Sequence, residues 1–206
     1  MKALSSFIIL LFMAFPVLAD DKEDAKFAEK SKKFVEKLST DVTSFLVDKE
    51  IEKKDLEKKF SKVLKASFDL PRIGRFVLGS YWKSSSDDQQ KEFIKLFESY
   101  IVQSYANQFS SYSGEDVDVK DVQTKGRYAF VSSTITAPEA ADVINVDWRV
   151  RKGKNGRLKI VDVIVEGVSL SLTQREDFAA VIQGKGGDVN ALLEALREKK
   201  MALTQT

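Results

Sequence analysis

The sequence of 206 residues contains no cysteine and no histidine. Disulfides are therefore impossible, and the commonest zinc ligands are absent, so packing alone must hold the fold. Serine–histidine–aspartate and cysteine–histidine catalytic arrangements are excluded, together with the commonest general base near neutral pH. Carboxylate chemistry stays open, so the composition disfavours an enzyme without excluding one. We predict no catalytic residue, metal site or cofactor.

An excess of charge of either sign is also missing. The chain has 33 basic and 31 acidic side chains, a formal net charge of +2. Lysines alternate with acidic residues at helical spacing, as in residues 52–59, which is typical of a solvated helix face. A nearly neutral chain exerts little long-range attraction on a phosphate backbone, so we expect no nucleic-acid partner.

A long apolar run occurs at the start of the chain, where Lys2 precedes apolar residues 7–15 and a Val17-Leu18-Ala19 cleavage motif. This run is too short to cross a membrane and indicates a cleaved signal peptide over residues 1–19. Because no cysteine follows, an acylated anchor is excluded. Residues 20–206 are expected to form a single domain in an extracytoplasmic space, the bacterial periplasm.

Apolar residues recur every three or four positions over 22–48 and 53–66, which predicts two helices. Pro71 ends the second helix and begins a short one reaching residue 78. A capping box from Ser86 to Gln89 opens a ring-rich helix that extends to Tyr112. Its apolar face consists of Phe93, Leu96, Phe97, Tyr100, Ile101, Tyr105 and Phe109.

The pattern then changes to alternation, which predicts strands at 117–122, 127–137, 141–151 and 157–168. Tight turns between them, including Asn155-Gly156, favour antiparallel pairing. A second capping box, Thr173 to Glu176, is expected to open a further helix. The glycines at 184–187 suit the end of that helix better than a phosphate loop, and a last helix follows. The expected class is α+β, an antiparallel sheet of four to five strands with helices on one face.

Two groups of residues have competing interpretations. Asp162 and Glu166 lie on an apolar strand, where a buried carboxylate could abstract a proton. The preferred alternative is that Glu166 caps a turn or pairs with Arg175, because no second catalytic group stands out. The aromatic side chains suit either a packed core or the wall of an apolar pocket, and periodicity alone favours the core.

Several motifs in unbroken order, from about Phe34 to Lys200, resemble the MlaC/toluene-tolerance family. Each motif is weak alone, but their order and spacing are specific. They are Val77-Leu78-Gly79-Ser80-Tyr81-Trp82-Lys83, Gln89, Phe97, Tyr105-Ala106, Tyr112, Glu166-Gly167-Val168-Ser169 and Lys185-Gly186.

The resemblance implies an NTF2-like α+β fold with an apolar cavity between sheet and helices. Members of this family are soluble periplasmic phospholipid carriers, not enzymes, and they maintain outer-membrane lipid asymmetry. They exchange lipid transiently with an outer-membrane lipoprotein–porin complex and an inner-membrane MCE-domain ABC transporter complex. The implied cargo is a phospholipid carried by a monomer, and a hopanoid is the alternative because some relatives are associated with these lipids.

For such a carrier, we expect the acyl tails to contact apolar residues from both halves of the chain. On the helical side we predict Val77, Leu78, Phe93, Phe97, Tyr100, Ile101 and Tyr105, with Tyr81 and Trp82 near the mouth. On the strands we predict Val131, Ile135, Val146, Trp148, Ile160 and Val163. Arg72 and Arg75 are the candidates for contact with the head-group phosphate.

Overall fold

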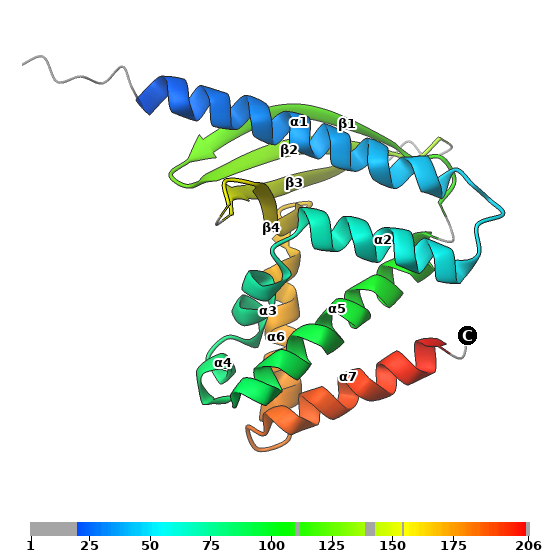
Figure 1. Ribbon diagram of the computed structural model, residues 1–206, viewed down its shortest axis with the longest axis vertical. Coiled ribbons are helices and arrows are strands. Elements are labelled where there is room, and N and C mark those ends of the chain that lie inside the picture. The colour runs from blue at the N-terminus through cyan, green and yellow to red at the C-terminus, as the bar shows by residue number, and fades with distance from the viewer. Residues whose placement is uncertain (1–19, 110–111, 139–142, 154, 205–206) are drawn as a thin grey trace, which may run out of the picture.

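The computed structural model describes residues 20–109, 112–138, 143–153 and 155–204 (Figure 1). The predicted signal peptide, residues 1–19, lies outside this part of the chain. Among the described residues, no helix combines the length and the apolar content that a membrane crossing requires.

In the described part of the chain, five helices come first, then a sheet, then two more helices. The helices of the first half are α1 (Asp20–Leu46), α2 (Lys53–Ser67), α3 (Leu70–Leu78), α4 (Tyr81–Ser84) and α5 (Asp87–Phe109). The strands are β1 (Asp116–Lys125), β2 (Tyr128–Thr136), β3 (Val143–Lys152), β4 (Leu158–Val165) and β5 (Val168–Ser169). The chain closes with α6 (Leu170–Gln183) and α7 (Val189–Thr204).

The strands pair in sequence order, each antiparallel to the next, so the sheet is a meander. Helix α1 runs along one face of it (Figure 1). Alternate residues of β2 to β4 point toward this helix and are buried, because a strand sends successive side chains to opposite faces. The contacts join Phe27, Val35 and Leu38 to Ala129, Val131, Val150 and Ile160. The predicted α+β class and antiparallel sheet are confirmed.

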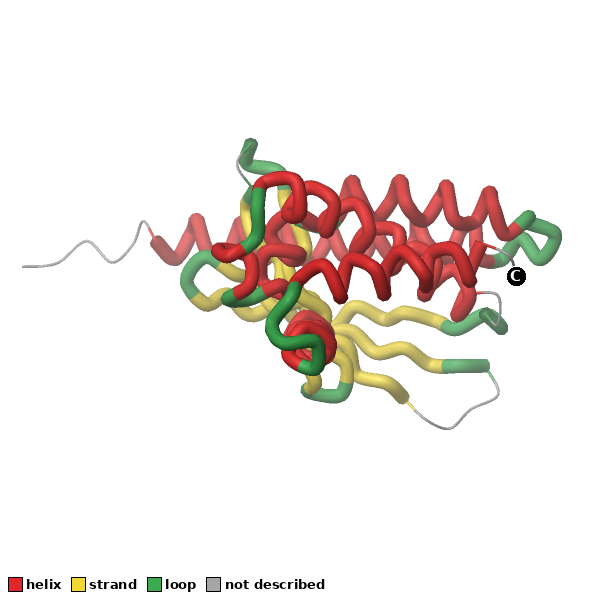
Figure 2. The backbone as a smooth tube through the Cα atoms, turned by 90° about the horizontal axis from the view of Figure 1, so that it is seen from below, coloured by secondary structure: helices red, strands yellow, loops and turns green. Residues whose placement is uncertain are grey.

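The remaining helices lie beside the sheet rather than across its whole face (Figure 2). Helix α5 packs against both α2 and α7 (Figure 1). Helices α3, α5, α6 and α7 share a core that contains four rings, which we call the aromatic cluster: Phe93, Phe97, Tyr100 and Phe178. Ring centroids are 5.6 Å apart for Phe93 and Phe97, 5.9 Å for Phe93 and Phe178, and 6.1 Å for Tyr100 and Phe178. Offset and edge-on arrangements at these separations are favourable for aromatic rings.

The first capping box is confirmed. The Ser86 amide donates to the Gln89 side chain at 2.9 Å, and the Gln89 amide donates to the Ser86 hydroxyl at 3.2 Å. The predicted extension of that helix to Tyr112 is wrong, since α5 ends at Phe109. Near Tyr112 the chain turns toward β1, with Gly114 at a φ of 103° and the Ser113 amide bonded to the Glu115 side chain at 2.9 Å.

The prediction that a capping box from Thr173 to Glu176 opens the next helix is wrong. Helix α6 begins three residues earlier than Thr173, because the Ser169 hydroxyl accepts from the Leu172 amide at 3.1 Å and caps the helix. The run predicted as one strand over 157–168 divides into β4 and the short β5. Glu166 and Gly167 form the turn, with φ values of 48° and 79°, and the short helix α4 was not predicted at all.

One irregularity of the sheet matters for the site. Val150 pairs with Ile160, but its neighbour Arg149 pairs with Asp162, so β4 carries one extra residue at Val161. In such a bulge two consecutive side chains oppose one residue of the partner strand. Val161 and Asp162 therefore both project from the sheet face opposite α1.

Candidate functional site

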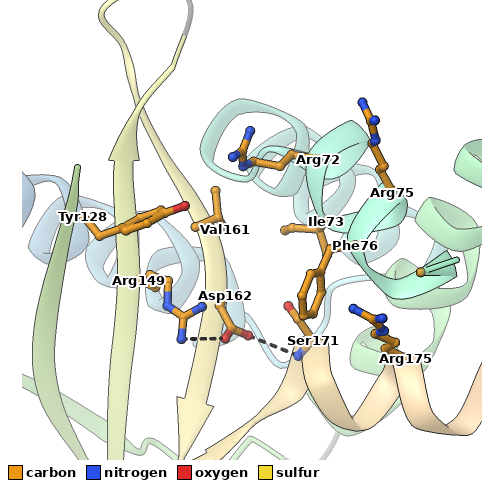
Figure 3. A pocket seen from close by; sticks show the side chains of 11 residues that line it. Arg72, Ile73, Arg75, Phe76, Tyr128, Arg149, Val161, Asp162, Ser171 and Arg175 are labelled. Carbon is orange, nitrogen blue, oxygen red and sulfur yellow. Dashed lines mark hydrogen bonds and ion pairs between the residues drawn. The ribbon is translucent and has the colours of Figure 1, made fainter. Parts of the chain in front are cut away.

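A cleft of about 570 Å³ lies between α3, the start of α6 and the sheet face opposite α1 (Figure 3). Its volume is within the range of roughly 300–1,000 Å³ that is typical of small-molecule sites. We call it the arginine cleft, because four of its lining residues are arginines. The lining consists of Arg72, Ile73, Arg75, Phe76, Gly79, Tyr128, Arg149, Val161, Asp162, Ser171 and Arg175.

Helix α3 supplies one wall of the cleft. Asp69 caps this helix by accepting from the Arg72 amide at 3.3 Å, and Pro71 occupies its first turn. One side of α3 is buried, whereas Arg72, Arg75 and Phe76 on the other side are exposed. Ile73 belongs to both sides: it lines the cleft and also packs in the buried core around the aromatic cluster.

The sheet supplies the opposite wall, where the β4 bulge turns Val161 and Asp162 into the cleft. Asp162 is only 3% exposed. Its carboxylate accepts from the Ser169 hydroxyl at 2.7 Å and from the Ser171 amide at 3.1 Å, and lies 3.5 Å from an Arg149 guanidinium nitrogen. A carboxylate at the first turn of a helix is stabilised by the exposed amides there. Asp162 therefore fastens α6 to the sheet and has a structural role.

Arg175 lines the cleft from α6, and its position depends on Gly79. The Arg175 guanidinium carbon lies 5.3 Å from the centre of the Phe76 ring, a cation–π contact. Gly79, the residue after α3, has a φ of 61°, which side chains disfavour. A Cβ atom on it would also lie 3.0 Å from the Arg175 Nε. Glycine at this position therefore allows both the backbone conformation and the close approach of Arg175.

The charges of the cleft are unbalanced. Four guanidinium groups and one carboxylate line it, and that carboxylate is already bound to Arg149. Within the described part of the chain, no carboxylate lies within ion-pair distance of Arg72, Arg75 or Arg175. Guanidinium groups present paired donors that match the oxygens of phosphates and carboxylates. The cleft thus places guanidinium donors beside apolar side chains, an arrangement that suits an anion with an apolar neighbour.

Arg72 and Arg75, predicted for the head group, line this cleft; the predicted tail residues do not. Val77, Leu78, Phe93 and Phe97 are buried in the core around the aromatic cluster, and Tyr81, Trp82, Tyr100 and Ile101 pack against it. Tyr105 packs instead against Phe60, with ring centroids 6.1 Å apart. Burial, with a contribution from Tyr100, raises the pKa of the Tyr105 hydroxyl above its ordinary value.

The predicted strand residues lie on the α1 side of the sheet, away from the cleft. Val131, Val146 and Ile160 are buried, and Trp148, Val163 and Ile135 are half-buried. Val131, Trp148 and Val163 face one another across three strands, and Trp148 donates to the Ser133 hydroxyl at 3.0 Å. Contact of any of these residues with acyl tails stays a prediction.

The sequence reasoning missed Arg149, Arg175, Phe76, Tyr128 and Val161 as lining residues. For Arg149 the sequence did contain a signal. Arg149 follows Trp148 in an alternating strand, so its side chain is expected on the opposite face of the sheet from Trp148. Glu166, the second candidate carboxylate, is exposed in the β4–β5 turn, where its side chain accepts from the Asn145 amide. Turn formation therefore accounts for Glu166. Among the described residues no cluster of acidic side chains could hold a metal ion.

The comparison with protein families is decisive, because the model described as "MlaC protein" matches residues 36–198. The chain belongs to the MlaC family. The "Intermembrane phospholipid transport system binding protein MlaC" of Haemophilus influenzae is 30% identical over 123 residues, 58% of this chain and 58% of that protein. The "Toluene tolerance protein ttg2D" of Pseudomonas putida is 23% identical over 136 residues, 65% of this chain and 62% of that protein. The matches thus span less than two thirds of either relative.

Among solved structures, a phospholipid-binding protein from Ralstonia solanacearum in complex with a phospholipid has a similar fold. The TM-score is 0.71 at 24% identity, and the match covers 84% of this chain and 98% of that one. It shows that this MlaC-family chain shares that architecture. The motif residues Gly79 and Ser169 are both structural in the MlaC-family chain: one admits Arg175 and the other caps α6.

Proposed function

We propose that this MlaC-family protein binds a phospholipid, with its phosphate in the arginine cleft and its acyl chains among the apolar side chains behind α3. The observation that carries the proposal is the continuity between cleft and core at Ile73. On one side of this residue lie guanidinium groups, and on the other the aromatic cluster. A phospholipid needs both surroundings within a few ångströms of each other.

The driving force for holding the tails is apolar burial. Each CH₂ group removed from water contributes about 0.8 kcal/mol, so two long acyl chains represent on the order of 20 kcal/mol. The rings of the aromatic cluster are already in contact. The tails therefore enter by displacing ring contacts, and the predicted residues of α3 and α5 become their walls.

The proposed role is transport without chemistry. Asp162 is engaged by three partners and Glu166 by a turn, which leaves neither as a proton acceptor for a ligand. We place the protein in the periplasm as a monomer that passes lipid between outer-membrane and inner-membrane MCE-domain complexes. The signal-like residues 1–19 and the names of the relatives support this placement.

Native mass spectrometry of the gently purified protein, followed by lipid extraction, tests the proposal. We expect a stoichiometric phospholipid. Arg75→Gln should take up lipid from vesicles several-fold less than the native chain, whereas Arg157→Gln, an exposed arginine outside the cleft, should not. A protein that is empty and takes no lipid from vesicles would rule out the carrier function. Recovery of a hopanoid in place of phospholipid would show that the protein carries a hopanoid instead.

A further inference from the structure

The arginine cleft carries an uncompensated positive charge, which bears on the class of head group it accepts. Four arginines and a single carboxylate line it. That carboxylate is 3% exposed and held by Ser169, Ser171 and Arg149, so it cannot turn toward a ligand. Nearby Asp69 is also engaged, lying 3.8 Å from an Arg151 guanidinium nitrogen. Among its described lining residues, the cleft thus offers several guanidinium donors for an anion and no free carboxylate for a cation.

Phospholipid head groups differ in this respect. All carry an anionic phosphate ester, but phosphatidylethanolamine adds an ammonium group and is neutral as a whole, whereas phosphatidylglycerol retains its negative charge. An ammonium group in this cleft would face Arg72, Arg75 and Arg175 with no carboxylate to bind it. Like charges brought together without a partner are disfavoured, and this is a common source of selectivity.

We propose that the cleft selects anionic phospholipids over zwitterionic ones, an inference that rests on the carrier function proposed above. The three guanidinium groups without ion-pair partners set the preference, and they enter from two elements, α3 and α6 (Figure 3). Arg149 contributes little to it, because Asp162 already balances its charge. The glycerol of phosphatidylglycerol is uncharged and tolerates this environment.

A competition experiment tests the preference. The purified protein is incubated with vesicles of equimolar phosphatidylethanolamine and phosphatidylglycerol with identical acyl chains, then re-isolated, and its bound lipids are quantified by mass spectrometry. Both lipids share one bilayer, so attraction of the protein to the vesicle surface affects them equally. We expect phosphatidylglycerol to be enriched about fivefold or more, since a single exposed charge pair changes an equilibrium by up to about fivefold.

The variant carrying Arg72→Gln, Arg75→Gln and Arg175→Gln should bind the two lipids in their vesicle ratio. Arg157→Gln is the matched control and should keep the enrichment. Raising NaCl to about 1 M, where the Debye length is about 3 Å, should weaken the preference of the native chain. Millimolar glycerol phosphate should not displace the lipid, because the acyl tails supply most of the affinity.

The outcomes separate the two proposals. Lipid bound in the vesicle ratio by the native protein overturns the selectivity and leaves the carrier function standing. Absence of bound lipid overturns both. Displacement by glycerol phosphate would show a site for free phosphate esters and also overturns the selectivity. The native ratio decides the question even where the triple variant fails to fold, and the single Arg75→Gln change then provides the second measurement.

Discussion

The two sides of helix α3 differ sharply although they are separated by half a turn. On one side Ile73, Val77 and Leu78 pack against Phe93 and Phe97, and almost none of this surface is exposed. On the other side two arginines and Phe76, which is 42% exposed, face the cleft. One short helix therefore separates the residues that stabilise the fold from those available to a ligand.

The energetics of the two sides differ as well. Full burial of a large apolar side chain contributes about 1.5–3 kcal/mol, whereas exposed charges contribute about 0–1 kcal/mol even when paired. The cleft side holds arginines without ion-pair partners in the described chain and a ring partly in water. Neither feature favours folding. Surfaces that stability does not explain are those where a function is to be sought.

The largest expected effect is on the buried side. Phe178→Ala removes a ring that is 5% exposed and contacts Phe93, Phe97 and Tyr100. Such a truncation should lower the free energy of unfolding by about 3–5 kcal/mol, measured by urea denaturation. Phe178→Leu, the control that keeps most of the apolar volume, should lose less than about 1.5 kcal/mol. Equal losses for both variants would contradict tight packing of the aromatic cluster.

A smaller effect is expected at Asp162, which lines the cleft and fastens α6 to the sheet. Asp162→Asn leaves the Arg149 guanidinium without its carboxylate but keeps an oxygen that can accept from the Ser171 amide. Arg149 is 35% exposed, so water replaces part of the lost contact, and we expect a loss of about 2 kcal/mol. Asp121→Asn, on the exposed side of β1, is the control and should be neutral. If Asp162→Asn leaves the free energy of unfolding unchanged, Asp162 does not have the structural role assigned to it.

The smallest effect on stability is expected in the cleft itself. Arg75→Gln should change the free energy of unfolding by less than about 0.5 kcal/mol, because its side chain is exposed and has no ion-pair partner in the described chain. The same urea titration measures it, with Arg157→Gln beside it. A loss above about 1 kcal/mol would mean that Arg75 supports the fold, and the contrast between the two sides of α3 would fail.

The aromatic cluster and the class of fold could be predicted because both depend on periodicity. Phe93 and Phe97 recur at helical spacing, and the strands alternate, so burial follows from the pattern itself. Arg72 and Arg75 were chosen for their chemistry and their place before the motif, and both line the cleft, while their contact with a head group stays a prediction. Family resemblance supplied the architecture that connects these parts.

The positions of the other cleft residues depend on structural features that produce no periodic pattern in the sequence. The bulge at Val161 shifts two side chains to one face, and nothing in the sequence around it distinguishes it from a regular strand. Arg175 is brought beside Gly79 by the packing of α6 on α3, a contact between residues far apart in the chain. The start of α6 was misplaced because Ser169 and Thr173 are both acceptable caps, and the sheet favours Ser169 through Asp162.

The bulge also has a consequence for how this cleft can change over evolutionary time. Because Ile160 pairs with Val150 and Asp162 with Arg149, loss of Val161 alone would restore a regular ladder on both sides of it. The pairing of every other residue in β4 would be preserved, and the Asp162 anchor would stay in place. A single-codon deletion or insertion at this point therefore adjusts the apolar wall of the cleft without disturbing the scaffold. The binding surface and the sheet that bears it can vary independently.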